Sequence, residues 1–190
     1  LVMKANYYLA VILLFMSSPL LAHTDGMFNE TLWQSLMHPL TGIDHLLVLV
    51  SVGLLGAKKG GYAVGVYPLV FLVMMVVGAG LNFQGIKIPF LETIIALSVI
   101  FMGYSLMMAD HFFSFALFAL LALFGVFHGY VHVSEIPDGI DSLNYLMLLL
   151  LSSFVISISA AVMGLFSEQR IYQLVTWVSL GSGFYLLAVS

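Results

Sequence analysis

Cysteine is absent from the 190 residues of this sequence. Its absence excludes disulfide bonds, thiolate metal sites, iron–sulfur clusters and a cysteine nucleophile. Any metal site must therefore use histidine, carboxylate, methionine, amide or backbone ligands. Charge is also scarce: only 7% of the residues are Asp, Glu, Lys or Arg, whereas soluble domains approach a quarter. The five Lys and Arg residues form no basic patch that would bind nucleic acid.

Apolar residues dominate instead. They make up 62% of the chain, and the mean hydropathy is +1.13. This composition is typical of an integral membrane protein whose partner is the lipid bilayer. No polar stretch is long enough to form a separate soluble domain. We therefore expect an all-α fold, a polytopic membrane helix bundle, with one domain over residues 23–190.

The first 22 residues resemble a secretory signal peptide. Lys4 precedes an apolar run from Tyr7 to Met16, and small residues follow up to Ala22, which predicts cleavage after Ala22. The alternative is an uncleaved first helix. Cleavage would place His23 at the new N-terminus, where its imidazole and the free amine could together capture a divalent cation.

Six apolar runs follow that are long enough to span a bilayer, at about 20 residues each. They cover roughly residues 37–56, 62–81, 88–108, 112–132, 143–166 and 170–189. The loops between them are short and carry glycine, proline or charge. We therefore expect six transmembrane helices, with sequence neighbours antiparallel in space.

Lysine and arginine set the expected orientation. Lys58, Lys59 and Arg170 lie in loops on one side, and Lys87 lies in a loop on the other. A cleaved signal places the mature N-terminus outside. The side that carries Lys58, Lys59 and Arg170 is then cytoplasmic, as expected for a bacterial inner membrane protein. The outer side then carries an acidic rim that would concentrate cations. The members of this rim are Asp25, Glu30, Glu135, Asp138 and Asp141.

The first polar cluster opens the first span. It reads His38-Pro39-Leu40-Thr41-Gly42-Ile43-Asp44-His45. If residues 38–56 form one helix, with Pro39 in its first turn, His38 and His45 lie two turns apart on the same face and Asp44 is next to His45. Ionisable groups at membrane depth are costly and usually functional.

A second cluster closes the fourth span. His128, His132 and Glu135 fall at intervals of four and three, which places them on one helix face. A His pair at this spacing commonly chelates a transition metal. The first span runs inward and the fourth outward, so both clusters should reach the external side. Glu92, one turn into the third span, should face the same side, although it could instead be an interfacial residue reaching water.

These motifs resemble the HupE/UreJ family of small membrane proteins. The resemblance rests on His38-Pro39-x-x-Gly42-x-Asp44-His45, on Glu92 with Ala96-x-Ser98, and on His128-Gly129-x-x-His132-x-x-Glu135-x-Pro137. It implies six mature spans and secondary, permease-like or channel-like uptake of Ni²⁺, or of Co²⁺ in some relatives. Two positions depart from the family pattern, Thr93 after the Glu and Val133 after the second His.

The sequence therefore predicts a transporter of a divalent transition metal, with no prosthetic group. The expected metal ligands are His38, Asp44, His45, Glu92, His128 and His132, with His23 and Glu135 as candidates for metal capture. Imidazole and carboxylate suit Ni²⁺, Co²⁺ and Zn²⁺ better than Mg²⁺ or Ca²⁺. Two alternatives remain open: an intramembrane zinc hydrolase in which Glu92 or Glu135 activates water, and a structural metal site. The oligomeric state is also open, with a homo-oligomer among the options.

Overall fold

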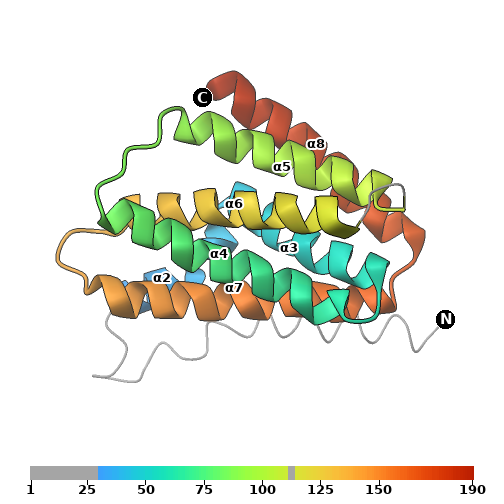
Figure 1. Ribbon diagram of the computed structural model, residues 1–190, viewed down its shortest axis with the longest axis horizontal. Helices are drawn as coiled ribbons and strands as arrows, with labels where there is room; N and C mark the ends of the chain where they lie inside the picture. The colour runs from blue at the N-terminus through green and yellow to red at the C-terminus, as the bar shows by residue number, and fades with distance from the viewer. Residues whose placement is uncertain (1–29, 111–113) are drawn as a thin grey trace.

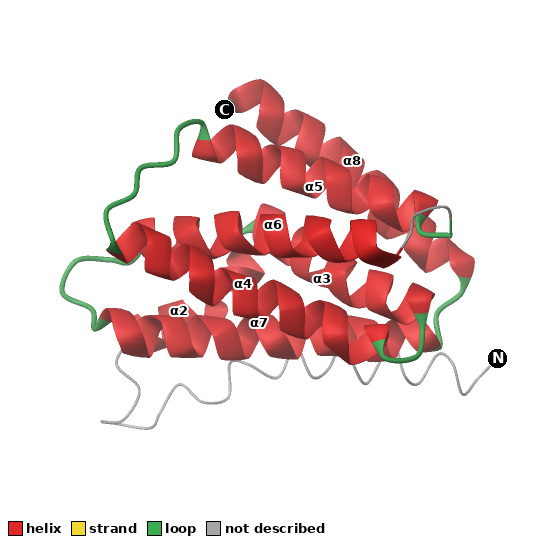
Figure 2. Cartoon of the chain, in the orientation of Figure 1, coloured by secondary structure: helices red, strands yellow, loops and turns green. Residues whose placement is uncertain are grey.

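A computed structural model describes residues 30–110 and 114–190. The proposed signal peptide, residues 1–22, and the candidate capture residue His23 lie outside the described residues. Every regular element in the described part is helical, as Figure 2 shows. This confirms the expected all-α fold.

The helices form one bundle (Figure 1). Their bounds are α2 Glu30–Thr41, α3 Ile43–Lys59, α4 Ala63–Phe83, α5 Leu91–Met108, α6 Ser114–Ser134, α7 Ser142–Leu165 and α8 Gln169–Val189. The five helices α4 to α8 are each long and apolar enough to cross a membrane. The pair α2 and α3 meets the same criteria together, which brings the count to six if the pair is one span.

The expectation of one continuous helix over residues 38–56 is wrong. The chain bends by 77° between α2 and α3, because Gly42 adopts an extended conformation with φ −81° and ψ 111°. Pro39 consequently lies near the end of α2 instead of in a first turn. The Thr41 hydroxyl donates a hydrogen bond of 2.9 Å to the His38 carbonyl oxygen within the last turn of α2.

Helix α3 lies at the centre of the bundle and is buried along most of its length. It packs against α4, α5 and α7, while α4 pairs closely with α6 and α5 pairs with α8. The approach of α4 to α6 requires glycine, because a Cβ at Gly78 would collide with the Val126 carbonyl and one at Gly129 with the Met75 carbonyl. Such small-residue contacts let membrane helices approach without a hydrophobic driving force.

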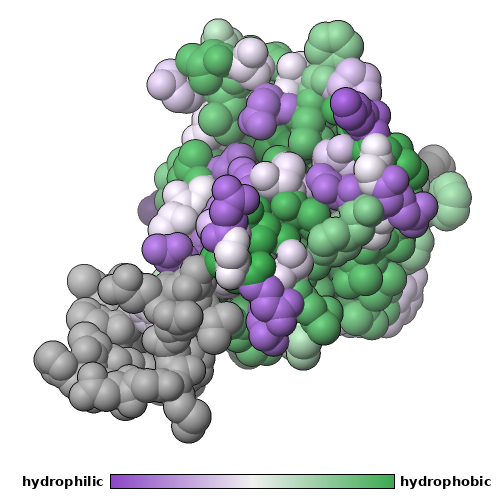
Figure 3. Space-filling model, turned by 90° about the vertical axis from the view of Figure 1, so that its left-hand side faces the viewer, coloured by the Kyte–Doolittle hydropathy of each residue, from purple (hydrophilic) through white to green (hydrophobic). Residues whose placement is uncertain are grey.

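The bundle has two distinct ends. At one end α4 and α6 finish and α5 and α7 begin, and Figure 3 shows hydrophilic side chains gathered there. Lys58 and Lys59 close α3 at the opposite end. The alternation of helix directions thus brings the start of α3 and the finish of α6 towards the same end, as the sequence predicts.

Candidate metal centre

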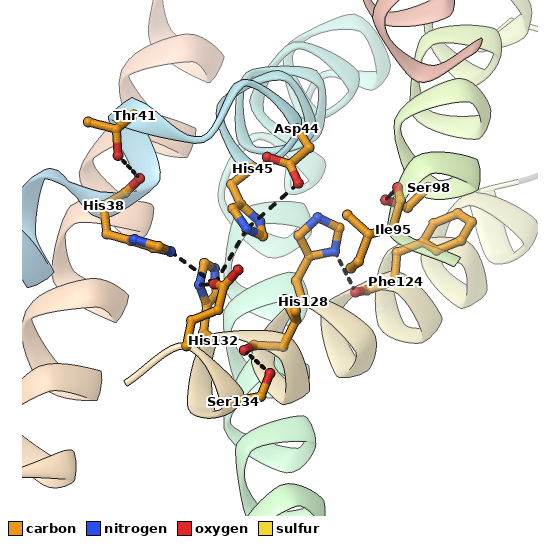
Figure 4. A network of polar contacts seen from close by, with 12 residues as sticks. His38, Thr41, Asp44, His45, Ile95, Ser98, Phe124, His128, His132 and Ser134 are labelled. Atoms are coloured by element: carbon orange, nitrogen blue, oxygen red, sulfur yellow. Dashed lines mark hydrogen bonds and ion pairs between the residues drawn. The ribbon is translucent and has the colours of Figure 1, made fainter. Parts of the chain in front are cut away.

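Four polar side chains, from α2, α3 and the end of α6, lie close together at one end of the bundle (Figure 4). His38 comes from the last turn of α2 and His45 from the first turn of α3, on either side of the bend at Gly42. His132 comes from the last turn of α6, and Glu135 follows just after that helix ends. The bend turns α2 across the bundle, so that both histidines of the first motif face the finish of α6.

The carboxylate of Glu135 lies at the middle of this group. Its Oε2 atom is 3.1 Å from Nε2 of His38, 3.5 Å from Nδ1 of His132 and 3.9 Å from Nε2 of His45. One carboxylate oxygen therefore faces three imidazoles that come from three helices.

The spacing of the donor atoms is close to that of a metal site. One ligand atom from each of the four residues lies within 4.8 Å of every other. Donors bound to a single ion at about 2.1 Å can be no more than roughly 4.2 Å apart. Four donors in a tetrahedral site would be about 3.4 Å apart, so the side chains would have to close in by on the order of an ångström to surround one cation.

The imidazoles are packed against one another and are largely withdrawn from solvent. The ring centroids of His45 and His132 are 4.2 Å apart, and those of His38 and His132 are 5.1 Å apart. His45 and His132 are buried, whereas the His38 side chain is 28% exposed and that of Glu135 is 40% exposed. The centre is therefore open towards the end of the bundle and closed towards its interior.

Glu135 is held as a carboxylate. Its partial burial alone would raise the pKa, but the interactions with the rings of His132 and His38 outweigh burial and lower the pKa of Glu135 to about 2. A carboxylate next to imidazoles keeps its charge through the physiological pH range, so the centre offers a negative oxygen to a cation.

His128 lies one turn deeper on α6 and extends the cluster inward. Its Nδ1 atom donates a hydrogen bond of 3.0 Å to the Phe124 carbonyl oxygen, and its ring centroid is 5.2 Å from that of His45. Because a carbonyl can only accept, the proton resides on Nδ1 and leaves Nε2 with a free lone pair. This Nε2 atom is buried and has no hydrogen-bond partner among the described residues. A fixed tautomer of this kind is typical of a metal-binding histidine.

Asp44 flanks the centre and does not belong to the four-residue group. Its Oδ2 atom is 3.8 Å from Nε2 of His45. The glycine at position 42 makes room for both side chains, because a Cβ there would lie 2.8 Å from His45 Cδ2 and 3.0 Å from Asp44 Oδ1. Asp44 therefore faces the same ring nitrogen of His45 that faces Glu135.

The structure brings most, but not all, of the expected ligands together. His38, His45, His128 and His132 meet with Asp44 beside them, while Glu135, expected only as a capture residue, lies centrally. Glu92 is exposed in the first turn of α5 and is not part of the group.

Sequence reasoning missed Tyr145. This residue is buried in α7, with its ring centroid 6.3 Å from that of His38. It belongs to no recognisable motif, and its only sequence signal is its position one turn after the helix cap at Asp141.

The fold and the cluster define a polytopic helical membrane protein with a histidine and carboxylate centre near one end of its bundle. Comparison with known proteins specifies the family: residues 11–189 match the family model described as HupE / UreJ protein. The chain belongs to the HupE/UreJ family.

Among curated proteins, the chain is similar to Protein HupE of Rhizobium leguminosarum bv. viciae. The two are 32% identical over 128 residues, which cover 67% of this chain and 67% of that protein. No solved structure matches this chain.

Proposed function

We propose that this protein is a secondary transporter, and not an enzyme, that takes up a divalent transition-metal cation, first of all Ni²⁺, across the membrane. One observation carries the proposal: a single oxygen of Glu135 faces the imidazoles of His38, His45 and His132, which come from three different helices of a membrane bundle. Buried ionisable groups within a membrane domain usually lie on a substrate or ion path.

The donor chemistry supports a transition metal. Three imidazoles and one carboxylate form a borderline ligand set that suits Ni²⁺, Co²⁺ and Zn²⁺, while Mg²⁺ and Ca²⁺ prefer oxygen ligands alone. Membership of the HupE/UreJ family ranks Ni²⁺ first and Co²⁺ second. In the proposed bound state, the cation replaces the contacts that Glu135 now makes with the three rings.

His128 and Asp44 have separate proposed roles. The Nε2 lone pair of His128 lies inward of the four donors, so this residue would receive the cation as it moves deeper. Asp44 would add a second carboxylate beside the cation, because its Oδ2 atom faces the same Nε2 atom of His45 as Glu135 does. Glu92 stands apart on α5, and we leave it out of the proposed ligands.

The charges at the two ends support an inward direction. Asp138 and Asp141 are exposed near the centre, while Lys58 and Lys59 lie at the far end of α3. An acidic entrance raises the local concentration of cations, and a lysine-rich end is typical of the cytoplasmic side. We therefore place the centre at the outer face of a bacterial inner membrane. In this proposal, residues 1–22 are a signal peptide that is removed when the protein is inserted.

No nucleotide-binding motif occurs in the sequence, so the proposed driving force is an ion gradient or the membrane potential.

The test is accumulation of radioactive Ni²⁺ by cells that produce the wild type or His45→Ala, with Co²⁺ and Zn²⁺ as competitors. We expect uptake by the wild type, loss of uptake in the variant, and equal amounts of both proteins in the membrane. The competitors then rank the metals. Absence of uptake by the wild type, together with stoichiometric metal in the purified protein, would overturn the proposal in favour of the hydrolase or structural-site alternative.

A further inference from the structure

One face of α3 runs from Asp44, which flanks the metal centre, to the opposite end of the bundle. Asp44, Ser51 and Lys58 follow one another at intervals of seven residues on this helix. Seven residues are close to two turns, so the three side chains lie in a line along the same face. At about 1.5 Å per residue, the line covers roughly 21 Å of the bundle.

The Lys58 end of this face is turned towards α5. Nζ of Lys58 donates a hydrogen bond of 3.0 Å to the Leu106 carbonyl oxygen and lies 3.5 Å from Oδ2 of Asp110. The Lys58 side chain is only 12% exposed, while that of Asp110 is 73% exposed. The lysine therefore links the end of α3 to the end of α5 and is itself largely withdrawn from solvent.

Two buried hydroxyls occupy the interior between the metal centre and Lys58. Ser51 on α3 is 0% exposed and Ser105 on α5 is 1% exposed. Neither Oγ atom has a hydrogen-bond partner in the part of the chain that the structure describes. Ser105 immediately precedes Leu106, whose carbonyl binds Lys58, so it lies close to the level of that lysine.

Five buried serines lack a hydrogen-bond partner among the described residues: Ser51 and Ser105, together with Ser153, Ser157 and Ser179 on α7 and α8. Other buried serines in the bundle do have a partner. The Ser98 hydroxyl donates to the Ile95 carbonyl at 2.6 Å, and the Ser152 hydroxyl donates to the Leu149 carbonyl at 3.0 Å. Buried polar groups are almost always hydrogen-bonded, and the exceptions call for an explanation. Hydroxyls without a partner can supply oxygen ligands to a passing hydrated cation, which aliphatic side chains cannot.

We propose that the cation leaves the metal centre along the face of α3 that carries Asp44, Ser51 and Lys58, and that Lys58 closes this route at its inner end. The inference rests on the proposed transport function. The hydroxyls of Ser51 and Ser105 replace part of the hydration shell between the centre and the exit. Lys58 opposes a divalent cation by charge, and the exit opens when the lysine releases Leu106 and swings towards solvent with Asp110.

The absence of cysteine makes this gate directly testable. Ser51→Cys would introduce a thiol into a sequence that has none. The rate of its modification by methanethiosulfonate ethylammonium is measured in lipid nanodiscs, where both faces of the membrane are accessible. We expect a rate at least tenfold higher when Ser51→Cys is combined with Lys58→Gln than when it is combined with Lys59→Gln.

Lys59→Gln is the matched control, because it removes the same charge from the same helix end. Ser152→Cys tests for general loosening of the bundle, and its modification should be equally slow in both lysine backgrounds. Equal rates for Ser51→Cys in the two backgrounds would overturn Lys58 as the gate, and a parallel rise at Ser152→Cys would do the same.

A transport measurement tests the hydroxyls. We expect Ser51→Ala to lower the maximal rate of Ni²⁺ uptake about fivefold, the size of effect that loss of one hydrogen bond at the barrier produces. The half-saturating concentration should stay unchanged, since the metal centre is intact, and Ser152→Ala should behave as the wild type. If Ser51→Ala keeps the maximal rate of the wild type while His45→Ala loses uptake, the proposed route is wrong. The proposed transport function would be unaffected by that result. Lack of uptake by the wild type would instead refute transport itself, while the labelling rates still report on the gate.

Discussion

Oε2 of Glu135 lies 3.1 Å from Nε2 of His38, although 97 positions separate the two residues in the chain. This contact joins the loop after α6 to the last turn of α2. It also ties together the two motifs that the sequence carries far apart. The contact depends on the bend at Gly42, since α2 must turn by 77° from the axis of α3 to bring His38 towards Glu135.

The central position of Glu135 leads to the first prediction. Glu135→Gln keeps the size of the side chain but removes the negative charge that faces three imidazoles. We expect the affinity of the purified protein for Ni²⁺ to fall by at least about tenfold, as measured by isothermal titration calorimetry. Asp138→Asn removes a charge from an exposed carboxylate at the same end and should leave the affinity within about twofold. Equal losses in the two variants would mean that only the overall charge of this end matters.

Gly42 provides a second prediction, because it acts on the centre without being a ligand. In Gly42→Ala the new Cβ would lie 2.8 Å from Cδ2 of His45, so the buried ring must shift. We expect weaker Ni²⁺ binding, by about tenfold, with little loss of thermal stability, because the extended backbone at this position, with φ −81° and ψ 111°, is also open to alanine. Gly80→Ala is the control, since nothing lies within 4 Å of its added Cβ. Unchanged Ni²⁺ binding in Gly42→Ala would show that the ring tolerates the displacement.

Hydropathy and loop charge were sufficient to predict the helical class and the approximate spans. Alternating helix directions also predicted that His38, His45, His128 and His132 would gather near one end. This part of the site follows from the sequence because each motif lies near the end of a span. Since successive spans run in opposite directions, counting them predicts which motifs lie at the same end of the bundle. Packing then determines only which of these helices are neighbours.

The remaining features depend on packing that the sequence does not display. The apolar pattern continues through Gly42, so the bend was missed, and a single glycine inside a helix is ordinarily tolerated. Glu92 is predicted among the ligands from the end of the third span at which it lies, whereas the sequence does not show which helices are its neighbours. Figure 1 shows that the loop before α5 carries the start of that helix away from the finish of α4 and α6, and α5 packs mainly along α8.

The pH dependence of metal binding supplies a third prediction. Glu135 has a pKa of about 2, below its usual 4.5, so its charge is present above pH 4.5 and is lost only as the pH falls towards 2. Protons compete with the metal for imidazole nitrogens nearer to neutral pH. We therefore expect Ni²⁺ affinity to fall as the pH is lowered from 8 to 5, through the imidazoles and not the carboxylate.

Glu135→Gln separates the two sources of this pH dependence. Its affinity should be lower at every pH, but it should still fall with acidification, because the imidazoles that protons compete for remain. A variant whose affinity no longer changes between pH 5 and pH 8 would instead assign the titration to Glu135.

The stability of the protein should depend on its metal. A ligand that binds only the folded state at one hundred times its dissociation constant stabilises that state by about 2.7 kcal/mol. For a chain of this size, that corresponds to a rise in the unfolding temperature of roughly 5–10 °C. We expect Ni²⁺ to produce such a rise in detergent-solubilised wild type, and a chelator to reverse it. His45→Ala removes a buried imidazole from the centre and should show a much smaller rise at the same Ni²⁺ concentration. An equal rise in the variant would place the stabilising ion elsewhere, because His45 contributes one of the four donors and its loss must weaken binding at the proposed centre.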